Sequence, residues 1–352
     1  MIAPDADRAV AARAAAPASL TERRPVVAPD RLIAELVPPR HFATASFDTY
    51  VPDLAHPSQA EARARLQRAA LQVTDAASRA GFWRRHRVEP VAVYLDGGFG
   101  VGKTHLLAAL AHAVGVERTA YGTFVEFTNL VGALGFLPTV EALAEKRLVC
   151  IDEFELDDPG DTVLMSRLLR ELADRGVSLA ATSNTLPGSL GEGRFAAEDF
   201  LREIQALAAR FDVLRIDGDD FRHRSVVTDA AGLADDDVRA AVAGRGGATL
   251  DDFGALLDHL ATVHPSRYGA LIDGVGLVGL TGLRAVPTQD VALRVVVLVD
   301  RLYDRDVPVL LGGAGEAVLF SAEMLVGGYR KKYLRALSRL GALAADGAAL
   351  VA

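Results

Sequence analysis

The stretch Tyr94-Leu-Asp-Gly-Gly-Phe-Gly-Val-Gly-Lys-Thr104 decides the fold of this chain. From Gly97 to Thr104 it fits the pattern G-x-x-x-x-G-K-[ST] in full. An apolar, β-prone run (residues 91–95) precedes it, and a helix-forming run (residues 105–114) follows it. This order of strand, glycine-rich loop and helix predicts a phosphate-binding loop rather than a plain turn before a buried helix.

The residue types in this loop indicate how each part of it would bind a nucleotide. Glycines let the backbone wrap closely around an anion, and the N–H groups of the loop and first helical turn point at its phosphates. Lys103 is expected to reach the β- and γ-phosphates, and the Thr104 hydroxyl to ligate Mg²⁺. The predicted nucleotide-binding set is Gly97, Gly98, Phe99, Gly100, Val101, Gly102, Lys103, Thr104 and His105.

Two later strand ends carry polar side chains. The apolar run 147–151 ends in Asp152 and Glu153, as a Walker B element does. We predict that Asp152 holds Mg²⁺ through water and that Glu153 orients or deprotonates the attacking water. The run 177–183 ends in Asn184, and a polar residue at this place lies beside the γ-phosphate in AAA+ proteins. Asn184 is therefore the sensor-1 candidate.

Strands alternating with helices over residues 90–220 predict an α/β fold with a doubly wound parallel sheet. Within the chain we expect Thr123–Phe127 to be a strand, Leu250–Leu260 a helix, and Ser58 the N-cap of a long helix. The expected divisions are a disordered leader (1–28), an N-terminal helical segment (29–89), an AAA+ P-loop core (90–224), and a smaller, mixed, mainly helical C-terminal lid domain (225–345).

Composition narrows the class of protein. The chain has 352 residues, half of them hydrophobic, and a formal net charge of −8. That charge argues against a broad nucleic-acid surface, although it leaves room for a local basic groove. The single cysteine, Cys150, excludes an internal disulfide and fits a reducing compartment. Neither a transmembrane run nor a signal peptide is evident, so we expect a cytoplasmic protein.

Several segments together resemble one branch of the AAA+ superfamily. They are IDEF at 151–154, ATSN at 181–184, DFRHR at 220–224, VDRLYDRDVPV at 299–309 and RALSRL at 335–340. Over residues 38–340 the chain resembles the ZapE cell-division ATPases of bacteria and their mitochondrial AFG-type relatives. The resemblance implies hydrolysis of ATP to ADP with Mg²⁺, a homo-oligomer, and a protein partner. That partner is the division-ring protein FtsZ for ZapE, and a quality-control client at the inner membrane for the mitochondrial branch.

The resemblance also implies two kinds of arginine. Arg335 and Arg339 are the lid-side candidates for contact with the nucleotide, and their i, i+4 spacing lets both face one side of a helix. A solvated basic face is the alternative. The catalytic arginine supplied in trans is less defined, because residues 196–199 lack the arginines that usually stand there. Arg194, Arg202 and Arg210 all remain candidates.

Two other functions stay open at this point. One is a helicase loader similar to the DnaC or IstB group, which the acidic balance and few aromatic residues disfavour. The other is a nucleotide-gated scaffold with negligible hydrolysis, against which an intact Lys103, Asp152 and Glu153 argue. For Tyr50 and Gln59 two roles remain open: contact with the adenine base, or packing within the loop.

Overall fold

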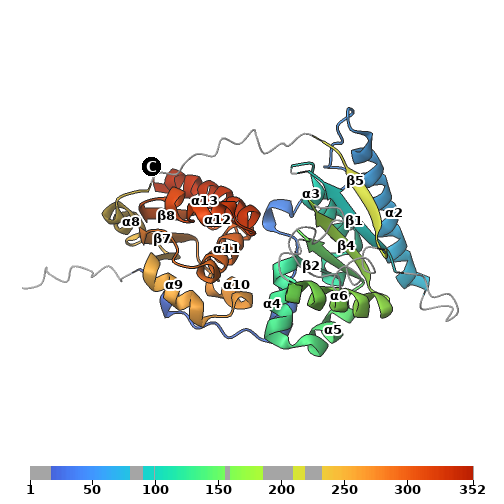
Figure 1. Ribbon diagram of the computed structural model, residues 1–352, viewed down its shortest axis with the longest axis horizontal. Helices are drawn as coiled ribbons and strands as arrows, with labels where there is room; N and C mark the ends of the chain where they lie inside the picture. The colour runs from blue at the N-terminus through green and yellow to red at the C-terminus, as the bar shows by residue number, and fades with distance from the viewer. Residues whose placement is uncertain are drawn as a thin grey trace, which may run out of the picture. The chain divides into compact units, whose positions relative to one another are not determined.

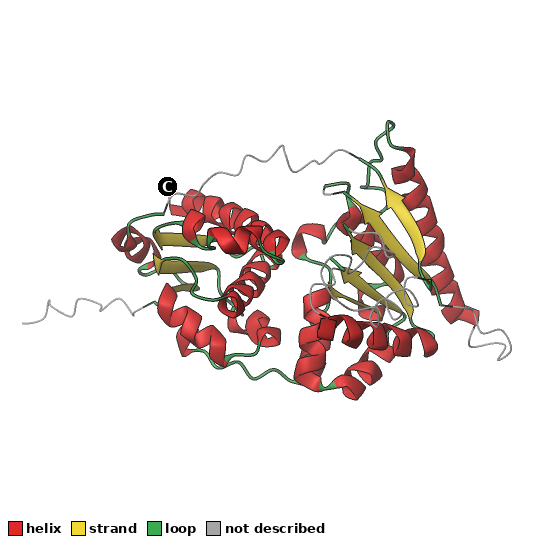
Figure 2. Cartoon of the chain, viewed as in Figure 1, coloured by secondary structure: helices red, strands yellow, loops and turns green. Residues whose placement is uncertain are grey.

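The chain divides into two compact units. The computed structural model describes residues 17–79, 90–98, 100–154, 159–184, 209–218 and 232–351 (Figures 1 and 2). Residues 27–226 form one unit, called here the phosphate-loop unit. Residues 1–26 and 227–352 together form the other, called the C-terminal unit.

The phosphate-loop unit is built on a five-stranded sheet of order β2-β3-β4-β1-β5. Each pairing within it is parallel, so each connection is a crossover that carries a helix or loop from one end of the sheet to the other. The predicted doubly wound α/β fold is confirmed. The strands are β1 Ala92–Gly97, β2 Thr119–Thr123, β3 Leu148–Asp152, β4 Ser178–Ser183 and β5 Asp212–Ile216.

Helices cover both faces of this sheet (Figure 1). One face packs against α2 (Pro57–Arg79) and α3 (Lys103–Val114), where Val93, Leu95 and Cys150 meet Leu106 and Leu110. On the other, Phe124 and Phe154 lie edge to face with ring centroids 5.4 Å apart. The helices on that side are α4 Phe124–Leu134, α5 Phe136–Ala144 and α6 Pro159–Asp174.

Within the described ranges, no single helix has both the length and the apolar character to cross a membrane. Helices α4 and α5 reach that threshold only as a pair, and they are bent by 118° relative to each other.

Two local predictions in this unit are wrong. Thr123 ends β2 and caps α4, because its hydroxyl accepts the Glu126 N–H and the Glu126 carboxylate accepts the Thr123 N–H. This capping box turns the predicted strand 123–127 into the start of a helix. Ser58 is not a cap either, since α2 begins at Pro57. Its hydroxyl instead accepts the N–H of Asp217, at 2.9 Å.

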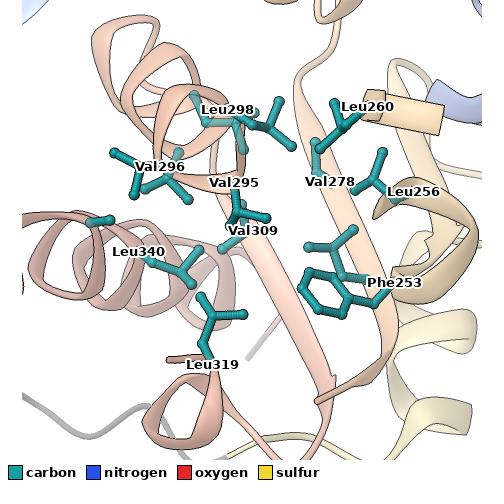
Figure 3. Packing of buried hydrophobic residues seen from close by; sticks show 14 of the residues in the cluster. Phe253, Leu256, Leu260, Val278, Val295, Val296, Leu298, Val309, Leu319 and Leu340 are labelled. Atoms are coloured by element: carbon teal, nitrogen blue, oxygen red, sulfur yellow. The ribbon is translucent and has the colours of Figure 1, made fainter. Parts of the chain in front are cut away.

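The C-terminal unit has its own parallel sheet, of order β6-β7-β8. Side chains alternate across it: Val278 and Val309 face α9, α11 and α13, whereas Leu310 faces α8. Figure 3 shows Val278 and Val309 packed among Leu256, Val295 and Leu340. The elements are α8 Asp235–Val242, β6 Ala248–Asp252, α9 Phe253–Thr262, β7 Leu277–Leu283, α11 Gln289–Asp304, β8 Val309–Gly313 and α13 Arg330–Val351.

The unit is mixed and mainly helical, as predicted, and one of its local predictions is wrong. The predicted helix 250–260 is in fact β6 followed by α9, which begins where the Asp252 side chain caps Ala255. The sequence pattern does not predict strand β7, because Gly279 interrupts its run of apolar residues. Gly279 is needed there, since a Cβ would lie 2.7 Å from a methyl of Val242 on α8.

The remaining described helices are short. The α-helices are α1 Pro29–Ala34, α10 Tyr268–Leu271 and α12 Ala322–Val326. The 3-10 helices are Leu20–Glu22, Arg40–Phe42, Val116–Arg118, Pro265–Arg267 and Glu316–Val318.

The described N-terminal residues are anchored in the C-terminal unit. The Asp251 carboxylate accepts the Ser19 hydroxyl at 2.5 Å and the N–H groups of Leu20 and Thr21 at 3.1 and 3.2 Å. The Leu20 side chain is fully buried, and the Ala18 carbonyl accepts the Leu250 N–H at the sheet edge. The predicted leader 1–28 therefore does not extend over residues 17–26, and helices α1 and α2 belong to the phosphate-loop unit.

We expect the substitution Leu20→Ala to weaken the C-terminal unit by about 2–5 kcal/mol, because it removes a fully buried side chain and leaves a cavity. Hydrogen exchange at the amides of β6 and β7 in the full chain measures this loss. Val26→Ala, at a residue that is 90% exposed, is the matched control. Equal protection in both variants would contradict the packing described here.

Candidate functional site

The phosphate loop joins the end of β1 to the start of α3. Gly100 and Gly102 have φ of +78° and +87°, a left-handed conformation that glycine adopts without strain. Gly97 is equally constrained, because a Cβ there would collide with the carbonyl of Ile216 on β5. The loop is thus shaped by glycines at the carboxyl end of a parallel strand, where α/β sheets bind their ligands. Phe99 lies outside the described residues.

Lys103 lies across this loop. Its ammonium donates to the carbonyls of Gly97 (2.7 Å) and Gly98 (2.5 Å) and to the Asn184 amide oxygen (2.9 Å). The side chain is buried, and the three oxygens compensate its charge. The contact with Asn184 joins the end of β4 to the loop across 81 positions of sequence. Lys103 and Asn184, both predicted site residues, are therefore brought together.

Asp152 lies at the carboxyl end of β3 and is buried. Its Oδ1 accepts hydrogen bonds from the Thr104 hydroxyl at 3.3 Å, from the Thr182 hydroxyl, and from the Glu153 N–H at 3.1 Å. Its Oδ2 accepts the Tyr121 hydroxyl at 3.0 Å. The two predicted metal ligands, Thr104 and Asp152, are thus in direct contact.

Glu153 follows with a left-handed backbone, at φ +54°. Its N–H donates both to Asp152 and to the Thr182 hydroxyl, at 3.0 Å. Such a conformation costs a non-glycine residue on the order of 1–3 kcal/mol and is concentrated at functional sites. The hydrogen bonds of its N–H hold Glu153 in this conformation immediately after the strand.

A segment before α2 supports the loop from outside. The Tyr50 hydroxyl donates to the Val101 carbonyl at 3.0 Å, and its ring packs on Gly102, where a Cβ would lie 2.5 Å away. Burial raises the pKa of Tyr50 to about 12, although Arg63 opposes the rise. The His105 side chain faces this segment too, with its ring centroid 5.7 Å from that of Tyr50. For Tyr50 the structure shows loop packing.

Gln59 is also engaged in packing. Its amide nitrogen donates to the Asp217 carbonyl and its amide oxygen accepts the Asp53 N–H, both at 2.9 Å. The side chain is buried and ties the loop before α2 to the end of β5.

Sequence reasoning missed three polar side chains at this site. Tyr121 and Thr182 both donate to Asp152, and Asp96 is buried at the end of β1. Burial raises the pKa of Asp96, whereas Arg215 and Lys103 oppose the rise. Thr182 could have been found as the residue two positions before Asn184, on the strand that Asn184 follows. Tyr121 carries no comparable signal, because its partner lies on a neighbouring strand.

The arginine candidates lie elsewhere. Arg335 and Arg339 on α13 both donate to the Asp300 carboxylate on α11, at 2.9 and 2.5 Å. Burial opposes the charge of Arg339, but the carboxylates of Asp300 and Asp304 outweigh it, so its pKa is raised. Arg210 pairs with Asp174 at 3.1 Å on the surface. Arg194 and Arg202 lie outside the described residues. The nucleotide role of all five arginine candidates stays a prediction.

This fold and this site define a P-loop nucleotide-binding protein of the α/β class. The family described as AFG1-like ATPase matches residues 26–241 and 233–349, nearly the whole chain. The chain belongs to this family, and the suspected resemblance is confirmed.

Individual relatives match a part of the chain. The cell division protein ZapE of Escherichia coli (strain K12) is 31% identical over 145 residues, which are 38% of this chain and 39% of ZapE. An uncharacterized protein of Schizosaccharomyces pombe is 29% identical over 150 residues, covering 38% of this chain and 33% of its own length. The matches thus span about two fifths or less of these relatives.

Among solved structures, DnaI is similar over 53% of this chain and 97% of its own, at 18% identity and a TM-score of 0.39. The DnaA of Aquifex aeolicus bound to AMPPCP is similar over 50% and 51%, at 13% identity and a TM-score of 0.38. Likeness at this level carries no argument about function.

We expect Gly102→Ala to destabilise the nucleotide-free loop and α3 by about 1–3 kcal/mol, because alanine is strained at φ +87° and its methyl meets the Tyr50 ring. Gly98→Ala is the control, since a Cβ there meets nothing within 4 Å. It should stay within about 0.5 kcal/mol of the parent. Hydrogen exchange at the α3 amides gives both values, and equal exchange in the two variants would refute the constraint.

Proposed function

We propose that this chain binds ATP with Mg²⁺ at the phosphate loop and hydrolyses it to ADP and phosphate. The observation that carries the proposal is that Lys103 is hydrogen-bonded to Asn184, and Thr104 to Asp152, although these residues come from three distant places in the sequence. Membership of the AFG1-like ATPase family supports it.

The residues present fit a magnesium ion. Thr104 Oγ1 and Asp152 Oδ1 are oxygen donors 3.3 Å apart at the start of α3 and the end of β3. Mg²⁺ prefers oxygen ligands and is usually held by one or two carboxylates together with substrate phosphates. In the part of the chain that the structure describes, no cluster of three or more His, Cys, Asp or Glu occurs. Bound there, Mg²⁺ would neutralise charge on the phosphate oxygens.

The protein residues divide the remaining work. Lys103 exchanges its carbonyl partners in the loop for phosphate oxygens and stabilises the negative charge that develops on them. Glu153, directly after Asp152, takes the proton of the attacking water or orients that water. Asn184, which accepts a hydrogen bond from Lys103, is proposed to hold the γ-phosphate or the water beside it.

Two arginine roles complete the proposal. A neighbouring copy supplies Arg202 or Arg210 to the γ-phosphate, so the active form is a homo-oligomer. Arg335 or Arg339 contacts the nucleotide from the C-terminal unit and links its position to the nucleotide state. The ion pairs with Asp300 hold both guanidinium groups in defined positions beforehand.

The energy of hydrolysis is proposed to act on a protein partner. The name of the relative ZapE, a cell division protein, supports a client at the division ring such as FtsZ. A quality-control client near a membrane is the other protein partner that the resemblance implies.

We expect Glu153→Gln to bind ATP with the affinity of the parent chain and to lose turnover by about 10²–10⁴-fold, because the amide cannot accept the proton of water. Phosphate release with Mg²⁺ and ATP measures turnover, and a fluorescent ATP analogue measures binding. Glu141→Gln, at an exposed residue of α5, is the control. Undiminished turnover in Glu153→Gln would remove this residue from the mechanism.

For the arginine in trans, we expect the correct alanine variant, Arg202→Ala or Arg210→Ala, to lose about 10³–10⁵-fold in turnover while it still binds ATP. Mixing it with the Glu153→Gln chain should restore part of the activity, because a mixed interface joins an intact Glu153 to an intact arginine. Arg175→Ala, which loses only a surface pair with Glu171, is the control. A mixture that stays inactive places the arginine in the same subunit as the site.

A further inference from the structure

One side chain at the site comes from a strand that carries no nucleotide-binding motif. Tyr121 lies in β2, is 2% exposed, and donates its hydroxyl to Asp152 Oδ2 at 3.0 Å. In the sheet register Tyr121 stands opposite Cys150, and Asp152 lies two residues further along β3. Residues two apart on a strand point to the same face, so Tyr121 and Asp152 share the face that packs on α3.

The two oxygens of the Asp152 carboxylate are held from different sides. Oδ1 receives the hydroxyls of Thr104 and Thr182 and the N–H of Glu153. Oδ2 receives the hydroxyl of Tyr121. The terminal torsion of an aspartate is broad and roughly two-fold, so a carboxylate fixed at one oxygen alone keeps rotational freedom. A donor at each oxygen removes that freedom.

We propose that Tyr121 is a positioning residue for the metal site, acting through Asp152. Its hydroxyl fixes the plane of the Asp152 carboxylate, so that Oδ1 stays directed at Thr104. This inference rests on the proposed function, because it needs Asp152 and Thr104 to hold Mg²⁺ together with the nucleotide. Groups that orient a metal ligand in this way commonly alter metal affinity by about 10–100-fold when removed.

A purely structural role for the Tyr121 hydroxyl predicts a different result. A buried tyrosine hydroxyl usually finds a hydrogen-bond partner, and Asp152 would then be only that partner. In that case the loss of the hydroxyl changes the stability of the fold and leaves the dependence on Mg²⁺ unchanged. A titration with Mg²⁺ therefore distinguishes the positioning role of Tyr121 from a purely structural one.

The test is Tyr121→Phe, which removes the hydroxyl and keeps the ring in its apolar cluster. A fluorescent ATP analogue is titrated with Mg²⁺, and the metal concentration at half-maximal change is compared with that of the parent chain. We expect this midpoint to rise about 10-fold. Binding of the analogue without Mg²⁺ should stay within about twofold, and saturating Mg²⁺ should restore most of the turnover.

Tyr268→Phe is the matched control. Tyr268 is fully buried in the C-terminal unit and donates its hydroxyl to the Leu260 carbonyl at 2.8 Å. This variant loses the same atom, the hydrogen bond to the Leu260 carbonyl and the one that Tyr268 accepts from Arg294 at 3.4 Å, and it leaves the residues of the phosphate-loop unit unchanged. Its Mg²⁺ midpoint should equal that of the parent chain. An unchanged midpoint in folded Tyr121→Phe would overturn the inference.

A second measurement does not depend on the folding of the variant. 3-Fluorotyrosine placed at position 121 keeps the hydroxyl, and its fluorine resonance is recorded with ADP alone and after addition of Mg²⁺. A shift on adding the metal supports the inference, whereas an identical resonance in both states overturns it. If the parent chain shows no Mg²⁺-dependent nucleotide binding, the proposed function itself fails. A parent that responds to Mg²⁺ beside an unresponsive Tyr121 rejects only the positioning role.

Discussion

The buried ammonium of Lys103 is the constraint on which the site depends. A charged group removed from water is costly unless polar groups compensate it. Here the compensation comes from two carbonyls of the loop and from Asn184 at the end of β4. The lysine thereby holds the loop in a folded shape and sets its distance from the neighbouring strand. The contact also explains why the loop and Asn184 are held together, since the buried charge requires oxygens from both.

The order of strands supplies the rest of the geometry. Strand β4 lies between β1 and β3, so the loop after β1, Asn184 after β4 and the acids at the end of β3 meet at one edge of the sheet. Strand β2 is next to β3 and brings Tyr121 to the far oxygen of Asp152. Four strands thus contribute to a site whose motifs lie on only three. A parallel sheet makes this possible because the carboxyl ends of all its strands lie on the same side.

Whether the role of a residue can be predicted from the sequence depends on whether the pattern that indicates it lies within one short stretch. The loop 97–104, Asp152 and Asn184 are readable because glycine spacing and polar strand ends appear directly in the sequence. The role of Tyr121 depends on the register between β2 and β3, which a single stretch of sequence does not contain. Leu20 was missed for a similar reason, since its burial depends on Asp251, 231 positions away. The start of α4 is different, because the capping box of Thr123 and Glu126 is local in the sequence and overrides the β propensity of the residues that follow it.

The pairing of two arginines with one carboxylate bears on how the C-terminal unit could act. Removing the sole partner of a buried charge costs about 3–5 kcal/mol. Asp300 binds both Arg335 and Arg339, so one guanidinium can leave while the other still compensates the carboxylate. Under the proposed function, one arginine at a time could therefore exchange Asp300 for a phosphate oxygen without leaving the Asp300 carboxylate uncompensated.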